Sequence, residues 1–160
     1  MNHPKEERTL ILIKPDAMQR GLLGEIVKRF EQKGLKIIGM KMTRLNEEVL
    51  KEHYAHHAEK PFFRGLSDYM QSAPIVAIVL SGLKAISSVR TIVGPTKGFD
   101  APAGTIRGDL SLSSQTNLVH ASDPAENPEA EIKRFFKEEE LFAYKKIDFD
   151  WVYGDEERNS

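Results

Sequence analysis

The sequence contains no cysteine, which excludes a disulfide framework, a thiolate nucleophile and a metal site built on cysteine. Its longest apolar run, Ile75–Leu80, has six residues, whereas a membrane-spanning helix needs about 20. Neither sign of charge dominates, since 23 basic and 24 acidic residues give a formal charge of −1. Such a chain has no global positive field for nucleic acid or an anionic membrane. The first residues are polar and lack the apolar region of a signal peptide, so we expect a soluble, cytoplasmic protein.

What the sequence does contain is typical of a globular protein. It has 160 residues, of which 40% are hydrophobic and 29% charged, and this is about one domain's worth of chain. No internal repeat or low-complexity stretch divides it. We therefore expect a single domain over residues 1–160, with residues 1–6 and 154–160 flexible because they are polar and terminal.

The spacing of hydrophobic residues predicts alternating strands and helices. Strands are expected at Thr9–Ile13, Leu35–Arg44, Ile75–Leu80 and Leu118–His120. Helices are expected at Gly21–Lys33, Glu47–Ala58, Pro61–Tyr69, between Gly82 and Gly94, and from Asn127 to Phe136, with Asn46 and Asn127 as N-caps and Gly34 as a C-cap. This order predicts an α+β fold of the ferredoxin-like, split βαβ type, a four-stranded antiparallel sheet with helices packed on one face. We also expect Trp151 and Tyr153 to pin the acidic C-terminal tail.

A long segment without clear periodicity, Gly94–Thr116, contains four glycines and two prolines. Segments of this kind inside a compact domain are usually functional or disordered. The overlapping stretch Lys84–Arg107 carries four basic residues against one acidic residue, and glycine and arginine both suit phosphate binding. Charge alone, however, is explained better by a solvated loop. Neither a G-x-x-x-x-G-K-[ST] nor a G-x-G-x-x-G motif occurs.

Three histidines are candidates for a functional role: His120 as a nucleophile, and His53 with His57 as metal ligands. His120 ends a short apolar stretch, where a histidine is most often structural, but neutral imidazole is also a good nucleophile and no cysteine competes with it. Glu131, one turn into a predicted helix, could hold one ring nitrogen and leave the other free to attack. His53 and His57 have the i, i+4 spacing of a two-histidine metal face, yet no H-E-x-x-H motif or evident third ligand accompanies them. We therefore expect no metal bound by protein ligands.

Several separated stretches become informative when they are taken together. They are Glu7–Asp16, Gln19–Glu25, His53-Tyr54, Pro61-Phe62-Phe63, Gly104–Asp109 and Asn117–Asp123. In their residues, order and spacing they resemble the nucleoside diphosphate kinase family, and the resemblance runs from about residue 7 to residue 153.

The resemblance implies that the terminal phosphoryl group of a nucleoside triphosphate passes to a nucleoside diphosphate through a phosphohistidine on His120, in a ping-pong reaction. It implies a catalytic set of His120, Glu131, Ser122, Lys14 and Tyr54, in which Glu131 and Ser122 position the ring. It implies a nucleotide-binding set of Lys14, Phe62, Arg90, Thr96, Arg107 and Asn117, with Phe62 stacking on the base and with Asn117 and Lys14 holding the sugar hydroxyls. Mg²⁺ is expected to be held mainly by the phosphates. The family also implies a homo-oligomer, with a hexamer favoured over a tetramer or dimer.

The chain departs from the usual family pattern at Gly94–Gly98, at Ala121 after the histidine, and at His56, where an acidic residue is common. A protonated His56 would add a cation near the phosphates. One alternative is a catalytically weak nucleotide-sensing or interaction module of the same fold, although His120, Lys14 and Arg107 are all present. A second is an RNA binder, which would need a basic, aromatic sheet face that the sequence does not encode.

Overall fold

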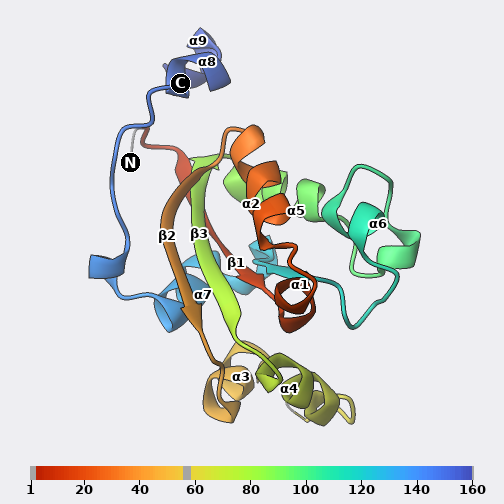
Figure 1. Cartoon of the computed structure of the whole chain (residues 1–160). Helices are drawn as coiled ribbons and strands as arrows, with labels where there is room; N and C mark the ends of the chain where they lie inside the picture. The colour runs from red at the N-terminus through yellow and green to blue at the C-terminus, as the bar shows by residue number, and fades with distance from the viewer. Residues whose placement is uncertain (1–2, 56–58, 160) are drawn as a thin grey trace.

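The computed structural model describes residues 3–55 and 59–159 (Figure 1). At its centre is a four-stranded antiparallel sheet in the order β2-β3-β1-β4. The strands are β1 (Glu6–Ile13), β2 (Lys36–Thr43), β3 (Ile75–Leu83) and β4 (Val119–Ala121). All four were expected from the sequence, and their order confirms the α+β, split βαβ arrangement.

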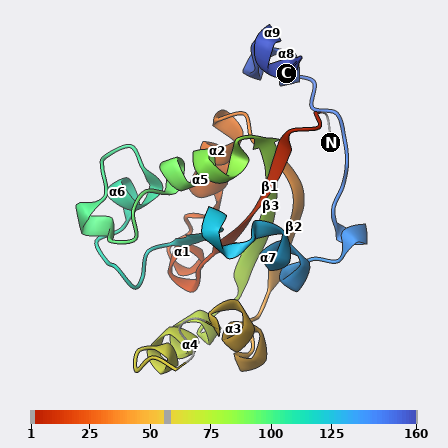
Figure 2. The same ribbon diagram turned by 180° about the vertical axis from the view of Figure 1, so that it is seen from behind.

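Helices cover both faces of this sheet, so the expectation of cover on one face was wrong. Side chains alternate along β1, and Ile11 packs in one buried cluster while Leu10 packs in the other. The first cluster is covered by α2 (Leu23–Gln32) and α5 (Ala85–Val93), and the second by α3 (Glu47–His53), α4 (Phe63–Gln71) and α7 (Pro128–Phe135) (Figure 2). The physical reason lies in β3, which is apolar along both faces and therefore has to be buried on both.

The helices follow the expected positions with some differences at their ends. Asn46 accepts a hydrogen bond from the Val49 amide at 2.9 Å, and Asn127 accepts one from the Ala130 amide at 3.3 Å, so both predicted N-caps are confirmed. Gly34 follows α2 with a φ of 94°, the left-handed geometry that favours glycine after a helix. Leu83 belongs to β3 and not to the following helix. The second helix ends at His53 and not at the predicted Ala58, while His56, His57 and Ala58 themselves lie outside the described residues.

Several short helical elements were not expected from the sequence. They are α1 (Pro15–Gln19), η2 (Gly98–Asp100), α6 (Ile106–Leu110), η3 (Pro124–Glu126), η4 (Glu138–Glu140), α8 (Phe149–Val152) and α9 (Asp155–Arg158). The segment Gly94–Thr116 is therefore only partly irregular. Thr105 caps α6 by accepting from the Gly108 amide at 3.0 Å, an interaction that hydrophobic periodicity does not reveal.

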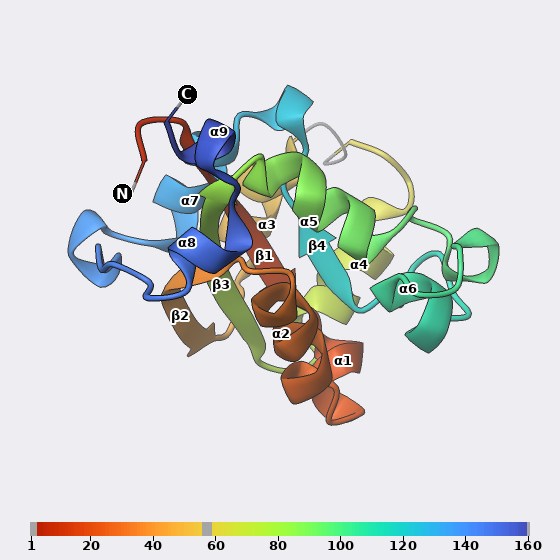
Figure 3. The same ribbon diagram turned by 90° about the horizontal axis from the view of Figure 1, so that it is seen from above.

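The two ends of the described chain lie close together, and residues near both ends line one hollow (Figure 3). Glu6 forms a buried ion pair with Lys36 at 3.0 Å, and residues 155–158 form α9. Tyr153 fastens the tail, since its hydroxyl accepts from the Leu83 amide at 3.0 Å. Trp151 does not fasten it, because its side chain is 91% exposed. Among residues 3–55 and 59–159, no helix is long and apolar enough to span a bilayer.

Candidate active site

A hollow of about 530 Å³ gathers most of the residues named from the sequence. Its lining includes Lys14, Tyr54, Phe62, Arg90, Thr96, Arg107, Asn117 and His120. These residues come from the ends of β1, α3 and α5, from the start of α4, from β4 itself, and from the segment before β4 that includes α6. Convergence of residues so distant in sequence is the arrangement expected of a binding site.

The backbone before His120 is held in an unusual conformation. Leu118 has a φ of 72°, a left-handed geometry that is strained for a leucine. The carboxylate of Asp16 accepts from the Leu118 amide at 3.1 Å, and the Leu118 carbonyl accepts from the Lys14 amide at 2.9 Å. These bonds fix the start of β4, in which His120 pairs with Leu12 of β1.

The His120 ring is held by a buried carboxylate on α7. Glu131 Oε1 lies 3.0 Å from His120 Nε2, and Glu131 is only 3% exposed. Burial opposes the charge of this carboxylate, but His120 and Ser122 outweigh that effect and hold the pKa of Glu131 below its usual value. A carboxylate accepts the Nε2 proton, so the lone pair of the ring is left on Nδ1.

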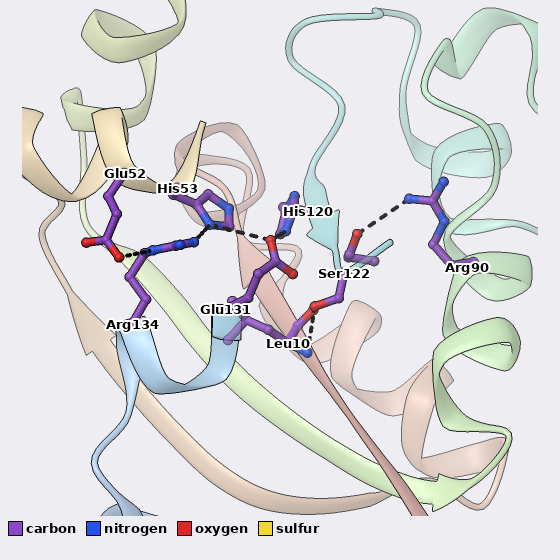
Figure 4. A network of polar contacts seen from close by, with 9 residues as sticks. Leu10, Glu52, His53, Arg90, His120, Ser122, Glu131 and Arg134 are labelled. Atoms are coloured by element: carbon purple, nitrogen blue, oxygen red, sulfur yellow. Dashed lines mark hydrogen bonds and ion pairs between the residues drawn. The ribbon is translucent and has the colours of Figure 1, made fainter. Parts of the chain in front are cut away.

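Ser122 lies beside this pair, and besides its effect on Glu131 its hydroxyl contacts strand β1 (Figure 4). Its hydroxyl oxygen accepts from the Leu10 amide at 3.1 Å and lies 3.4 Å from the Leu10 carbonyl. Ser122 therefore joins the end of β4, the strand that carries His120, to β1.

Two buried cations form the floor of the hollow. Lys14 Nζ donates to Asn117 Oδ1 at 2.7 Å, and burial, followed by the charge of Arg107, lowers the pKa of Lys14 to about 8. Arg107 donates to the carbonyls of Asn117 at 3.1 Å and Gly94 at 3.0 Å. Burial, followed by the charge of Arg90, lowers the pKa of Arg107 to about 10. Both lowered pKa values result from burial and from the closeness of other cations. Such a buried cluster of cations favours the binding of an anion.

The remaining lining residues complete the hollow. Asn117 Nδ2 donates to the carbonyls of Thr96 at 3.0 Å and Ser114 at 2.9 Å, which ties the segment Gly94–Thr116 to the floor. Tyr54 is buried at the end of α3, with its ring centroid 6.2 Å from that of His120. Phe62 is 52% exposed, so it offers an accessible aromatic face.

The sequence reasoning missed three neighbours of the hollow. Asp123 pairs with Arg90 at 3.1 Å, although no role was given to it within the stretch Asn117–Asp123. His53 was considered as a partner of His57 and belongs to the stretch His53-Tyr54, but it was given no role in the site; its ring centroid lies 4.5 Å from that of His120. Arg134 lies 3.2 Å from His53 Nδ1. No spacing rule could have placed the end of α3 against α7.

His53, His120 and Glu131 offer metal-ligand atoms within 4.8 Å of one another. Two of these atoms already share a hydrogen bond, and the Arg134 guanidinium lies beside the third residue. A cation next to a ligand atom opposes binding of a second cation, so the arrangement argues against a metal at this cluster.

Comparisons with known proteins agree with this geometry. The model of the nucleoside diphosphate kinase family matches residues 7–141. A nucleoside diphosphate kinase of Parabacteroides distasonis is 51% identical over 151 residues, covering 94% of this chain and 99% of the relative. Nucleoside diphosphate kinase B of Homo sapiens is 50% identical over 147 residues, covering 92% and 97%. The structure of a halophilic nucleoside diphosphate kinase from Halobacterium salinarum in complex with CDP superposes with a TM-score of 0.91, at 45% identity, covering 93% of this chain and 99% of that one. The chain belongs to the nucleoside diphosphate kinase family.

Proposed function

We propose that this protein moves the terminal phosphoryl group of a nucleoside triphosphate to a nucleoside diphosphate, with His120 as the intermediate carrier. The observation that carries the proposal is the bond between Glu131 and His120 Nε2, which leaves Nδ1 as the nucleophilic atom of a ring that lines the hollow. Nδ1 forms a bond to the γ-phosphorus, and the bond from that phosphorus to the bridging oxygen breaks. The diphosphate leaves with the bridging electron pair. An oxygen of a second diphosphate then attacks the phosphorus and releases Nδ1.

The cations of the hollow suit this transfer. Phosphoryl transfer depends on positioning and on cations around a dispersed charge more than on protein bases. We assign contact with the phosphates to Lys14, Tyr54, Arg90, Thr96 and Arg107. Glu131 holds the ring, and Ser122 supports it by fixing the strand on which it lies.

Mg²⁺ is expected to bind the phosphates of the nucleotide. Mg²⁺ prefers oxygen ligands and keeps several waters, and the carboxylate that lines the hollow, Asp123, is already paired with Arg90. The imidazoles of His53 and His120 are unsuited to this ion. When bound, Mg²⁺ neutralises part of the phosphate charge, while Lys14, Arg90 and Arg107 orient the terminal group.

The base is expected to stack on Phe62, and the sugar hydroxyls to bond with Asn117 and Lys14. A stacking contact accepts every base, because each base has an aromatic face. We therefore expect similar kcat/KM values for ATP, GTP, CTP and UTP. Steady-state kinetics with the four nucleotides measure this, and a ratio above about 10⁴ between any two would indicate hydrogen-bond recognition of the base instead.

Nucleotide binding is expected to take up a proton near pH 8. With a pKa of about 8, Lys14 is neutral in about half of the free protein at that pH. Phosphate oxygens near Nζ favour the ammonium form and raise its pKa. The attraction of Lys14 for the nucleotide is therefore complete below pH 8, and it is lost above pH 8 as the pH rises to the higher pKa of the bound state.

Calorimetric titration with ADP in buffers of different ionisation enthalpy measures the proton uptake. We expect up to about half a proton per site at pH 8 from Lys14. The Lys14→Met variant controls for protons taken up by other groups. The same uptake by that variant at pH 8 would assign the proton to a different group.

The assay that tests the function follows a labelled γ-phosphate from ATP to GDP, with nucleotide binding measured on the same sample. An enzyme forms labelled GTP with many turnovers. The alternative, a nucleotide-sensing module, binds both nucleotides and forms none. An RNA binder is disfavoured by the described part of the chain, because helices cover both sheet faces and leave no open platform on which bases could stack.

We further propose a single cytoplasmic domain that forms a homo-oligomer, with a hexamer favoured. Exposed apolar side chains support association, since Phe99 is 57% exposed, Leu112 90% and Ile147 94%. Light scattering coupled to size-exclusion chromatography separates a hexamer from a tetramer, a dimer or a monomer.

A further inference from the structure

A line of side chains leads from the protein surface to His120 (Figure 4). Arg134 Nε donates to Glu52 Oε1 at 2.8 Å, and Arg134 Nη1 lies 3.2 Å from His53 Nδ1. His53 Nδ1 in turn lies 3.5 Å from Glu131 Oε1, the same oxygen that lies 3.0 Å from His120 Nε2. Two histidines therefore approach one carboxylate oxygen from two sides.

The position of Arg134 determines which of the two histidines donates a hydrogen bond to Glu131 Oε1. A guanidinium has donors only, so a hydrogen bond from Arg134 requires a lone pair on His53 Nδ1. That lone pair makes His53 the neutral tautomer with its proton on Nε2. Such a ring has no Nδ1 proton to give to Glu131, and the carboxylate oxygen is left for His120.

We propose that Arg134 is a positioning residue for the nucleophile, acting through His53. By holding His53 as a hydrogen-bond acceptor, it prevents this ring from competing with His120 for Glu131. The inference rests on the proposed role of His120 as the attacking residue. It adds that the orientation of His120 depends on the charge of Arg134, which lies between the surface residue Glu52 and His53.

The groups around His53 determine how this ring responds to the loss of Arg134. Glu131 faces it from α7, His120 faces it from β4, and Tyr54 contacts its ring from the end of its own helix. The apolar ring of Phe135 covers a further side. Without the guanidinium, the nearby carboxylate favours a protonated His53 that donates from Nδ1 to Glu131. The His120 ring then shares its partner, and the sharing increases as the pH falls.

The test compares Arg134→Met with Arg134→Lys and with Lys133→Met, an exposed neighbour on the same helix. Single-turnover phosphorylation by ATP is measured from pH 6 to pH 8. For Arg134→Met we expect a rate several-fold below the parent at pH 6, a smaller deficit at pH 8, and an unchanged Kd for ATP. Arg134→Lys restores much of the rate because it restores a cationic donor. Lys133→Met behaves as the parent does.

The tautomer of His53 is read directly from the ¹⁵N shifts of its ring, which do not depend on catalysis. In the parent we expect Nδ1 without a proton at both pH values, and in Arg134→Met a protonated Nδ1 at pH 6. A protonated Nδ1 in the parent overturns the proposal even if His120 carries the phosphate. A pH profile of Arg134→Met that parallels the parent also overturns it. By contrast, a parent that is never phosphorylated on His120 overturns the proposed function.

Discussion

The His120→Ala variant is expected to bind nucleotides and to transfer no phosphoryl group above the background of the assay. The substitution removes the atom that forms the covalent intermediate, and no cysteine in the sequence can replace it. Loss of a covalent nucleophile usually costs roughly 10⁴- to 10⁶-fold in kcat. A coupled assay of ATP and GDP measures the loss, and calorimetry measures the retained affinity for ADP.

Glu131→Gln provides a graded comparison for this result. It keeps the shape of the buried side chain but removes the charge that stabilises the Nε2 proton of His120. We expect it to retain measurable transfer at a rate between those of the parent and His120→Ala. Transfer by His120→Ala at a rate near the parent's would show that the phosphoryl group takes another route.

The Arg90→Ala variant is expected to lose roughly 2–4 kcal/mol of transition-state stabilisation, which is about 30- to 1,000-fold in kcat/KM. Arg90 lines the hollow with its side chain 44% exposed, and its ion pair with Asp123 lies at the edge. An exposed ion pair contributes only about 0–1 kcal/mol to folding. We therefore expect the melting temperature to change by a few degrees at most.

Two variants separate catalysis from stability in this experiment. Arg44→Ala removes the same charge from an exposed position that does not line the hollow, and it should match the parent in both measurements. Arg107→Ala should lower activity and melting temperature together, because Arg107 is 7% exposed and bonds to backbone carbonyls. Parent-like kinetics for Arg90→Ala would remove Arg90 from the phosphate site.

The long elements of the fold could be predicted from the sequence because their cause is local. The continuous apolar run of β3 and the helical spacing of Ile26 and Phe30 in α2 are visible in the sequence. So are the caps at Asn46 and Asn127, which depend on residues within one turn. The short helix α6 could not be predicted, because its Asp109 is held by Arg29 of α2 at 2.7 Å, and that is a tertiary contact.

The candidate site followed from the family resemblance more than from patterns of residues. Periodicity gives no reason to join Lys14 to Asn117, although the two are bonded at 2.7 Å. The contact between His120 and Glu131 could be predicted from the sequence, because His120 ends a short predicted strand and Glu131 lies one turn into the helix that follows it. The network through His53 and Arg134 stayed hidden, because it depends on how α3 and α7 pack on the sheet.

The most direct test of the proposed mechanism is the position of the phosphoryl group on the intermediate. The protein is labelled with ¹⁵N in its histidine rings and incubated with ATP, and the phosphoenzyme is studied by ³¹P and ¹⁵N NMR before and after addition of GDP. Because Glu131 occupies Nε2 of His120, we expect a phosphorus bonded to Nδ1 of His120 that GDP removes completely. A phosphorus on Nε2, on another residue, or one that GDP leaves in place would contradict the mechanism.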